Sequence, residues 1–186
     1  MSPVLQQSQI IAAVKDKAAL SAACRLSLPA AFLLFGNITD LSKNVRVLKE
    51  NGKNVFVHID LIDGLRPDWE GIRYVAERVG ADGVLSTKPA AVKQAREFGL
   101  KTVFRIFMID ASAFDTGVQA VKTCGPDAVE VMPGLVYDVI TELAKSIRMP
   151  IIAGGMVKTA KQAGQALTSG AQAVSTSSAD IWRLFP

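Results

Sequence analysis

Short apolar runs alternate with helical stripes along the chain. Seven of these runs are rich in β-branched residues, have the length of buried strands, and begin about 19 to 28 residues apart, which is the spacing of a repeated strand–helix unit. The pattern predicts strands at Ala31–Phe35, Val55–Asp60, Gly83–Thr87, Thr102–Phe107, Ala128–Met132, Pro150–Gly154 and Ala173–Ser177.

Between these runs the apolar positions recur with helical spacing. Residues 136–147 place apolar side chains at i, i+3, i+4, i+7 and i+11, and similar stripes occupy residues 69–79 and 41–48. Cap and stop residues agree with this division. They are Asp40, Asp68 and Ser112 as amino-terminal caps, Pro89 as a first helical residue, and Gly52, Gly80, Gly99 and Gly170 as stops.

The segment Gln9–Leu20 is interpreted as an amino-terminal helix, with Ile10, Ile11 and Val14 along one face, that covers a gap or an end of the sheet. The strand–helix alternation runs on without a linker or a shift in composition. This continuity predicts one α/β domain over residues 1–186, built on a parallel sheet.

The sheet is expected to close into a barrel. No GxGxxG motif follows the first strand, so an open dinucleotide-binding sheet lacks its main signal. Alternation along the strands places His58, Arg105 and Glu130 among apolar neighbours, and a barrel has one interior in which such charges can meet. We therefore predict a TIM-type (β/α) barrel that is incomplete, with seven parallel strands.

Composition narrows the class of protein. Of the 186 residues, 49% are hydrophobic and 20% are charged, which excludes intrinsic disorder. No apolar run approaches the roughly 18 residues that span a bilayer, and the amino terminus lacks the pattern of a signal peptide. Cys24 and Cys124 are far apart and are expected to be reduced. We expect a cytoplasmic protein that binds no membrane, metal or cofactor.

The net charge of +4 permits a phosphate or nucleic-acid partner without requiring one. Two basic stripes could contact RNA phosphates: Lys43, Arg46 and Lys49 (with Lys53), and the pair Lys93 and Arg96. No aromatic stacking platform accompanies them, so a solvated helix face explains the same spacing.

The last two predicted strands end in residues suited to an anion. Gly154 and Gly155 follow one strand, and Ser175, Thr176 and Ser177 end the next, ahead of a short helix. Glycines let backbone amides approach a phosphate, hydroxyls add donors, and these two loops are the usual phosphate site of a barrel. The alternative is that the glycines turn the chain and the hydroxyls cap the helix.

Charged residues in the other strands allow two interpretations each. His58 is the sole histidine and lies near Asp60, so it fits a general base or a histidine bonded within the barrel. Arg105 and Glu130 lie on strands that should be neighbours, so they fit a structural ion pair or a pair that holds an anion and accepts ligand hydroxyls. Lys88 ends the third strand at the mouth, either solvated or near a phosphate.

Several segments together resemble the glycerol-3-phosphate-responsive antiterminator family, the glycerol uptake operon antiterminator regulatory proteins. The resemblance spans about residues 9–183 and rests mainly on KNVFVHIDLIDGL at 53–65 and on PIIAGGMV at 150–157 with GAQAVSTSSADIW at 170–182. Further matching segments are IIAAVKD at 10–16, LLFGNI at 33–38, ADGVLSTK at 81–88, FRIFMIDASA at 104–113 and PDAVEVMPG at 126–134.

The resemblance implies a seven-stranded incomplete barrel that senses glycerol 3-phosphate and acts on the leader mRNA of glycerol catabolism genes, so that transcription passes a terminator. It implies no catalytic residue. By matching motif, the phosphate would be held by Gly154, Gly155, Ser175, Thr176 and Ser177, and the rest of the pocket would be lined by Asn37, His58, Asp60, Lys88, Arg105 and Glu130.

An enzyme of the isomerase or aldolase type, acting on a phosphorylated sugar, is the alternative, because the same fold hosts both classes. Carboxylates and a lysine at strand ends could transfer protons. The residues themselves predict a barrel with a phosphate ligand, whereas RNA and antitermination come from the resemblance. The sequence leaves open whether the protein is a monomer or a homo-oligomer.

Overall fold

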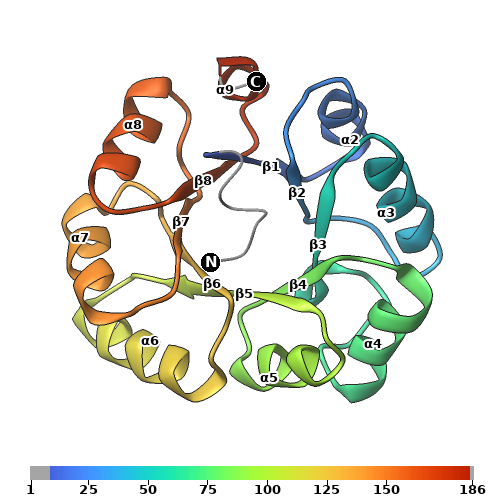
Figure 1. Cartoon of the computed structure of the whole chain (residues 1–186), viewed down its shortest axis with the longest axis horizontal. Helices are drawn as coiled ribbons and strands as arrows, with labels where there is room; N and C mark the ends of the chain where they lie inside the picture. The colour runs from blue at the N-terminus through green and yellow to red at the C-terminus, as the bar shows by residue number, and fades with distance from the viewer. Residues whose placement is uncertain (1–8, 185–186) are drawn as a thin grey trace.

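The chain folds into a closed ring of eight parallel strands surrounded by helices (Figure 1). This computed structural model describes residues 9–184. The strands follow one another around the ring in sequence order, and β8 pairs with β1. They are β1 (Ile10–Val14), β2 (Ala30–Leu33), β3 (Asn54–His58), β4 (Gly83–Ser86), β5 (Lys101–Phe107), β6 (Ala128–Met132), β7 (Ile151–Gly154) and β8 (Ala173–Thr176).

Helices follow the strands and form the outer layer (Figure 1). They are α2 (Lys17–Cys24), α3 (Leu41–Glu50), α4 (Trp69–Tyr74) with its π-helical continuation η2 (Val75–Val79), α5 (Pro89–Glu97), α6 (Ala111–Cys124), α7 (Tyr137–Ser146), α8 (Ala160–Thr168) and α9 (Ala179–Leu184). A single 3-10 turn, η1 (Ile59–Leu61), directly follows β3. The predicted TIM-type (β/α) barrel is confirmed.

The predicted strand count of seven was wrong, and so was the incomplete barrel. Residues Ile10–Val14 form β1 rather than part of a helix, and β1 closes the ring by pairing with both β8 and β2. All five residues are buried, so the run is apolar on both faces and has no period that separates strand from helix. The helix begins only at Lys17, where the Asp16 carboxylate accepts the Ala19 amide at 2.7 Å.

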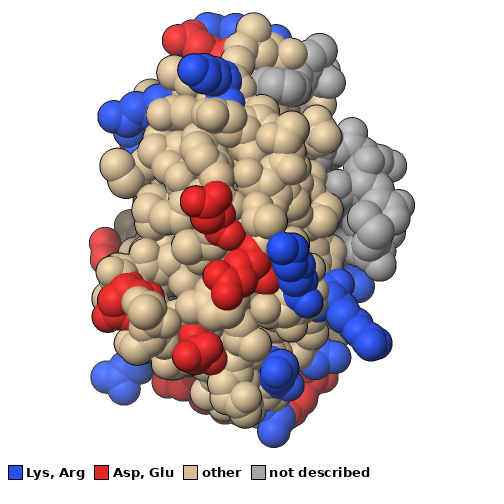
Figure 2. Space-filling model, turned by 90° about the vertical axis from the view of Figure 1, so that its left-hand side faces the viewer, with Lys and Arg blue, Asp and Glu red and all other residues tan. Residues whose placement is uncertain are grey.

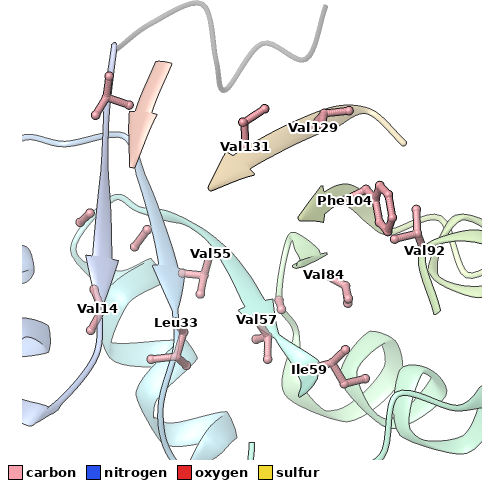
Figure 3. Packing of buried hydrophobic residues seen from close by; sticks show 14 of the residues in the cluster. Val14, Leu33, Val55, Val57, Ile59, Val84, Val92, Phe104, Val129 and Val131 are labelled. Atoms are coloured by element: carbon pink, nitrogen blue, oxygen red, sulfur yellow. The ribbon is translucent and has the colours of Figure 1, made fainter. Parts of the chain in front are cut away.

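Two apolar layers hold the barrel together. On the outer face of the strands, side chains such as Val55, Val57 and Phe104 pack against the helices, and Phe104 points toward Val92 of α5 (Figure 3). The lumen has its own smaller cluster, in which the rings of Phe32 and Phe56 meet edge to face. The other lumen residues of this cluster are Ile11, Ala30, Leu85, Val103, Ala128, Ile152 and Ala173.

The apolar lumen cluster ends before the carboxyl ends of the strands. Two positions beyond Phe56, Val103 and Ala128, strand alternation brings His58, Arg105 and Glu130 into the same interior. All three are buried. The fold therefore fills the amino end of the lumen with hydrocarbon and concentrates polar groups toward the mouth.

The capping predictions are mostly confirmed. The Asp68 carboxylate accepts the Gly71 amide at 3.0 Å at the start of α4, and Pro89 is the first residue of α5. Ser112 was a wrong cap, because the Asp110 carboxylate accepts the Ala113 amide at 2.9 Å and so caps α6. The Ser112 hydroxyl instead donates to Asp110 at 2.8 Å.

Candidate functional site

A cavity of about 230 Å³ opens at the carboxyl ends of the strands. It is lined by residues from β1, β5, β6 and β8 and by the segments that follow β1, β2, β7 and β8. Its polar lining comprises Lys15, Arg105, Glu130, Lys158, Ser175, Thr176 and Ser177, together with the backbone of Gly155.

An ion pair between Arg105 and Glu130 forms one wall of this cavity. The parallel register of β5 and β6 sets the two residues side by side, and Arg105 Nε donates to Glu130 Oε2 at 2.6 Å. The Arg105 side chain is 8% exposed and that of Glu130 is 1% exposed, so each charge needs the other to offset its lost hydration. Arg105 and Glu130 thus form the ion pair that was one of the two interpretations of the sequence.

Glu130 is held on its other side by β8. The Ser175 hydroxyl donates to Glu130 Oε1 through a short hydrogen bond. Both carboxylate oxygens are therefore engaged by the protein. This differs from the expectation that Glu130 accepts ligand hydroxyls, which now requires one of these bonds to open or a second donor to share the oxygen.

The two glycines after β7 have different roles. A Cβ at Gly154 would collide with Glu130 Oε1 and the Ser175 hydroxyl, so the missing side chain makes room for the Glu130–Ser175 contact. Gly155 has φ +72, a left-handed conformation that favours glycine, and it lines the cavity. Gly155 can therefore bring its backbone to a ligand, whereas Gly154 shapes the wall behind it.

The three hydroxyl residues at the end of β8 are also distinct. The Thr176 hydroxyl donates to the Val157 carbonyl at 2.7 Å and accepts the Ser178 amide at 3.1 Å, so it ties the last two loops together. The Trp182 indole donates to the Thr176 carbonyl at 2.7 Å. Ser177 is exposed at the cavity, while Ser175 faces Glu130. The structure thus places all three at the cavity and leaves Ser177 the most accessible.

Two lysines of the cavity were missed by the sequence analysis. Lys15 directly follows β1, and Lys158 lies in the loop between β7 and α8. Together with Arg105 they give the lining three cationic side chains against the single carboxylate of Glu130. Lys158 follows the Gly154–Gly155 pair closely enough in sequence to be inferred, whereas the interpretation of residues 9–20 as a helix gives Lys15 no place at a strand end.

A second polar cluster lies at β3 and β4, apart from the lining of this cavity. His58 Nδ1 is 3.4 Å from Asp60 Oδ2, although it does not meet hydrogen-bond geometry, and Lys88 Nζ is 4.0 Å from Asp60 Oδ1. The Thr87 amide donates to Asp60 Oδ2 at 3.1 Å. The sequence predicts one pocket for His58, Asp60, Lys88, Arg105 and Glu130; of these, Arg105 and Glu130 line the cavity of about 230 Å³, while the contacts of Asp60 are with His58, Thr87 and Lys88.

The charge of Asp60 is favoured by its neighbours. Burial raises the pKa of Asp60, but interactions with the His58 imidazole, the Ser86 hydroxyl and the Thr87 amide together lower it by more than burial raises it. The net pKa of Asp60 therefore lies below its ordinary value. Asp60 is therefore an anion at neutral pH, partnered by His58 and accompanied by Lys88.

Asn37 takes part in a turn between β2 and α3. Its side-chain oxygen accepts the amides of Thr39 at 2.9 Å and Asp40 at 3.0 Å, and Asp40 takes the predicted cap position of α3, without a side-chain hydrogen bond to the helix. The loop is joined to the one after β3, because the Asp63 amide donates to the Gly36 carbonyl at 3.0 Å. Asn37 is not among the residues that line the cavity.

The basic stripe of α3 lies on the outer surface, away from the mouth cavity. Lys43, Arg46 and Lys49 line a hollow of about 620 Å³ that also includes Arg78 of η2. Lys49 is paired with Asp82 at 2.8 Å, and Arg46 lies 3.9 Å from Glu50. Lys53 does not belong to this surface, because it is buried and donates to the carbonyls of Leu26 and Asn51.

The α7 side of the barrel carries charges of both signs (Figure 2). Acidic side chains gather in the middle of that view, and basic ones lie toward its edges, so this side does not present a continuous basic surface. Within residues 9–184, no helix has the length and apolarity of a membrane span, and no cluster of His, Cys, Asp and Glu has the composition of a metal site.

Comparisons with known proteins agree on one family. Residues 10–182 match the family model of the glycerol-3-phosphate responsive antiterminator. The chain is 35% identical over 181 residues to the uncharacterized protein YgcP of Escherichia coli (strain K12), covering 97% of this chain and 95% of that protein.

Two solved structures share both sequence and fold with the chain. One is the glycerol uptake operon antiterminator regulatory protein of Listeria monocytogenes, with 32% identity, a TM-score of 0.91 and 95% of each chain covered. The other is a glycerol uptake operon antiterminator-related protein of Thermotoga maritima, with 34% identity, a TM-score of 0.84, and 95% of this chain and 98% of that chain covered. The chain belongs to the glycerol-3-phosphate responsive antiterminator family.

Proposed function

We propose that the chain binds glycerol 3-phosphate in the cavity at the mouth of the barrel. The observation that carries this proposal is the lining of the cavity, where three cationic side chains face one carboxylate. The phosphate is assigned to the rim, near Gly155 and Ser177 and between Lys15 and Lys158. This location matches the usual phosphate site of a barrel, at the loops after its last two strands.

The glycerol end is assigned to the inner part of the cavity, near Arg105. Nε is the nitrogen that binds Glu130, which leaves the two terminal nitrogens of the guanidinium as donors toward a ligand in the cavity that Arg105 lines. Ligand hydroxyl oxygens can accept from them. The size of the cavity, about 230 Å³, suits a small phosphate ester.

The bound ligand is proposed to control an action on the leader mRNA of glycerol catabolism genes. A ligand shifts such an equilibrium only if it binds one conformation more tightly than the other. The loops after β1, β7 and β8 all contribute to the cavity, so a phosphate held between them would favour the conformation in which all three contact it. The basic surface of α3, with Lys43, Arg46 and Lys49, is the proposed RNA contact.

A regulator without catalysis is favoured over a phosphate-sugar enzyme. A general base must lie within hydrogen-bond reach of the proton it removes. The carboxylate that lines the cavity is Glu130, and both of its oxygens already accept bonds from Arg105 and Ser175. His58, Asp60 and Lys88 have the chemistry of proton transfer, but they belong to the cluster outside the cavity lining.

Calorimetric titration of the purified protein with glycerol 3-phosphate tests the proposal. We expect heats that saturate at a fixed stoichiometry and return to baseline after each injection. Heat that continues until the ligand is consumed would indicate turnover and would favour the enzyme. If no heat is released at two temperatures, the ligand proposal is wrong. A gel-shift titration with leader mRNA, with and without glycerol 3-phosphate, then tests the RNA step.

A further inference from the structure

The charge of Arg105 is already balanced before any ligand enters. The Glu130 carboxylate contacts its Nε at 2.6 Å, and both side chains are more than nine-tenths buried. The inner wall of the cavity is therefore a neutral pair that offers hydrogen-bond donors without a net positive charge. The two lysines, in contrast, are exposed residues at the rim.

The protein holds the Glu130 carboxylate in this arrangement from three sides. Arg105 binds one oxygen, the Ser175 hydroxyl binds the other, and the absence of a side chain at Gly154 leaves the space that the carboxylate occupies. A carboxylate fixed by three strands cannot easily move away to admit a second anion. The neutral wall is thus a built feature of β5, β6, β7 and β8.

From this geometry we infer that Glu130 determines ligand specificity, by rejecting phosphate esters whose other end is an acid. The inference rests on the proposed function, and it divides the cavity into a cationic rim for the phosphate and a neutral wall for a polyol. Glycerol 3-phosphate and 3-phosphoglycerate share the phosphate, but the second has a carboxylate where the first has a hydroxymethyl group.

A carboxylate at the inner wall would lose hydration without gaining a free countercharge. Burying an uncompensated charge costs more than burying a hydroxyl that finds a donor. Glu130 would also repel it, since like charges at close range disfavour binding. A hydroxyl, in contrast, can accept from the terminal nitrogens of Arg105 at no electrostatic penalty.

A ligand panel on the unmodified protein provides the first test. Calorimetric titrations with glycerol 3-phosphate, 3-phosphoglycerate and inorganic phosphate are compared at pH 7 and at one ionic strength. We expect glycerol 3-phosphate to bind at least about tenfold more tightly than 3-phosphoglycerate. If the two esters bind equally, or if the acid binds more tightly, the specificity inference is wrong while the proposed site stands. If neither ester binds, both proposals are wrong.

A substitution of Glu130 then tests the cause of the selectivity. Glu130→Gln keeps the shape of the side chain and removes its charge, so Arg105 becomes a free cation at the inner wall. We expect the preference for glycerol 3-phosphate over 3-phosphoglycerate, measured as the ratio of their affinities, to fall by about tenfold or to reverse. Glu130→Asp keeps the charge and should retain the preference for glycerol 3-phosphate even where its overall affinity is lower.

If Glu130 has a purely structural role, Glu130→Gln should weaken binding of both esters by the same factor and leave the ratio of their affinities unchanged. That result would overturn the inference. Circular dichroism and thermal unfolding identify a variant that does not fold. In that case the ligand panel on the unmodified protein decides the question, because it needs no substitution.

Discussion

The space occupied by the Glu130 carboxylate exists because residue 154 has no side chain. A Cβ at Gly154 would lie too close to Glu130 Oε1, to the Glu130 carboxyl carbon and to the Ser175 hydroxyl. Gly154→Ala is therefore expected to destabilise the protein by about 1–3 kcal/mol, the usual range for overpacking a buried site, and to weaken binding of glycerol 3-phosphate. Urea unfolding and calorimetry measure the two effects.

Gly164 in α8 is the matched control for this substitution. Its added Cβ would meet no atom within 4 Å, and the residue lies inside a helix. Gly164→Ala should raise stability by about 0.5–1 kcal/mol, because alanine favours a helix over glycine, and it should leave ligand binding unchanged. Equal effects of the two substitutions would contradict the role given to Gly154.

Neutralising the rim lysines, Lys15 and Lys158, is expected to weaken binding of glycerol 3-phosphate. Lys15→Gln and Lys158→Gln should each reduce the affinity for glycerol 3-phosphate about tenfold, since a hydrogen bond to a charged group contributes roughly 1.5–3 kcal/mol. Both side chains line the cavity. Calorimetry at two salt concentrations measures the loss, which should diminish at high salt.

Lys17→Gln is the control for Lys15, because Lys17 is an exposed residue at the start of α2 and does not line the cavity. It should bind glycerol 3-phosphate as the unmodified protein does. If Lys17→Gln and Lys15→Gln reduce the affinity by the same factor, the effect reflects the overall charge of the protein and the rim assignment is wrong.

Strand periodicity predicted most of the fold because each strand is an apolar run bounded by polar turns. All seven predicted runs overlap a strand, but Val55–Asp60 extends past β3, because the chain turns into η1 at Ile59. The prediction of a helix at Ile10–Val14 was wrong for a different reason. An alternating pattern separates strand from helix, and a run that is buried on both faces does not alternate.

The candidate site was only partly predictable for a related reason. The sequence places Gly155 and Ser177 at strand ends, and the parallel topology then brings them to one mouth. It cannot show that Gly154 supports Glu130, because that contact depends on side-chain positions across β6, β7 and β8. Nor can it show that Asp60 accepts the Thr87 amide and lies near His58 and Lys88, because these contacts depend on side-chain positions across two loops.

Charge reversal on α3 is expected to weaken binding of leader mRNA. The triple variant Lys43→Glu/Arg46→Glu/Lys49→Glu removes three cations from one surface, so the slope of log affinity against log salt should fall by up to about three. Lys49 also forms an ion pair with Asp82, and the Lys49→Glu change removes that ion pair. Filter binding at several salt concentrations measures the slope.

Lys122→Glu/Lys145→Glu changes charge on α6 and α7 and serves as the control. Retained binding of glycerol 3-phosphate by the α3 variant shows that it is folded. An α3 variant that binds leader mRNA with unchanged affinity and salt slope would place the RNA contact elsewhere on the molecule.

Asp60→Asn is expected to destabilise the protein more at neutral than at acidic pH. The interactions with His58, Ser86 and Thr87 outweigh burial and hold the pKa of Asp60 below its ordinary value. A carboxyl with a lowered pKa in the folded state stabilises the fold above its unfolded pKa of about 3.9, and this contribution disappears as the pH falls through the folded value.

Urea unfolding of the unmodified protein and of Asp60→Asn, from pH 7 down to about pH 3, measures this dependence. The difference in free energy of unfolding should be largest at pH 7 and should shrink toward the acidic end. Asp63→Asn changes an exposed loop residue three positions away and should show a small difference at every pH. A difference for Asp60→Asn that stays constant across the range would mean that the residue acts through its shape and not through its charge.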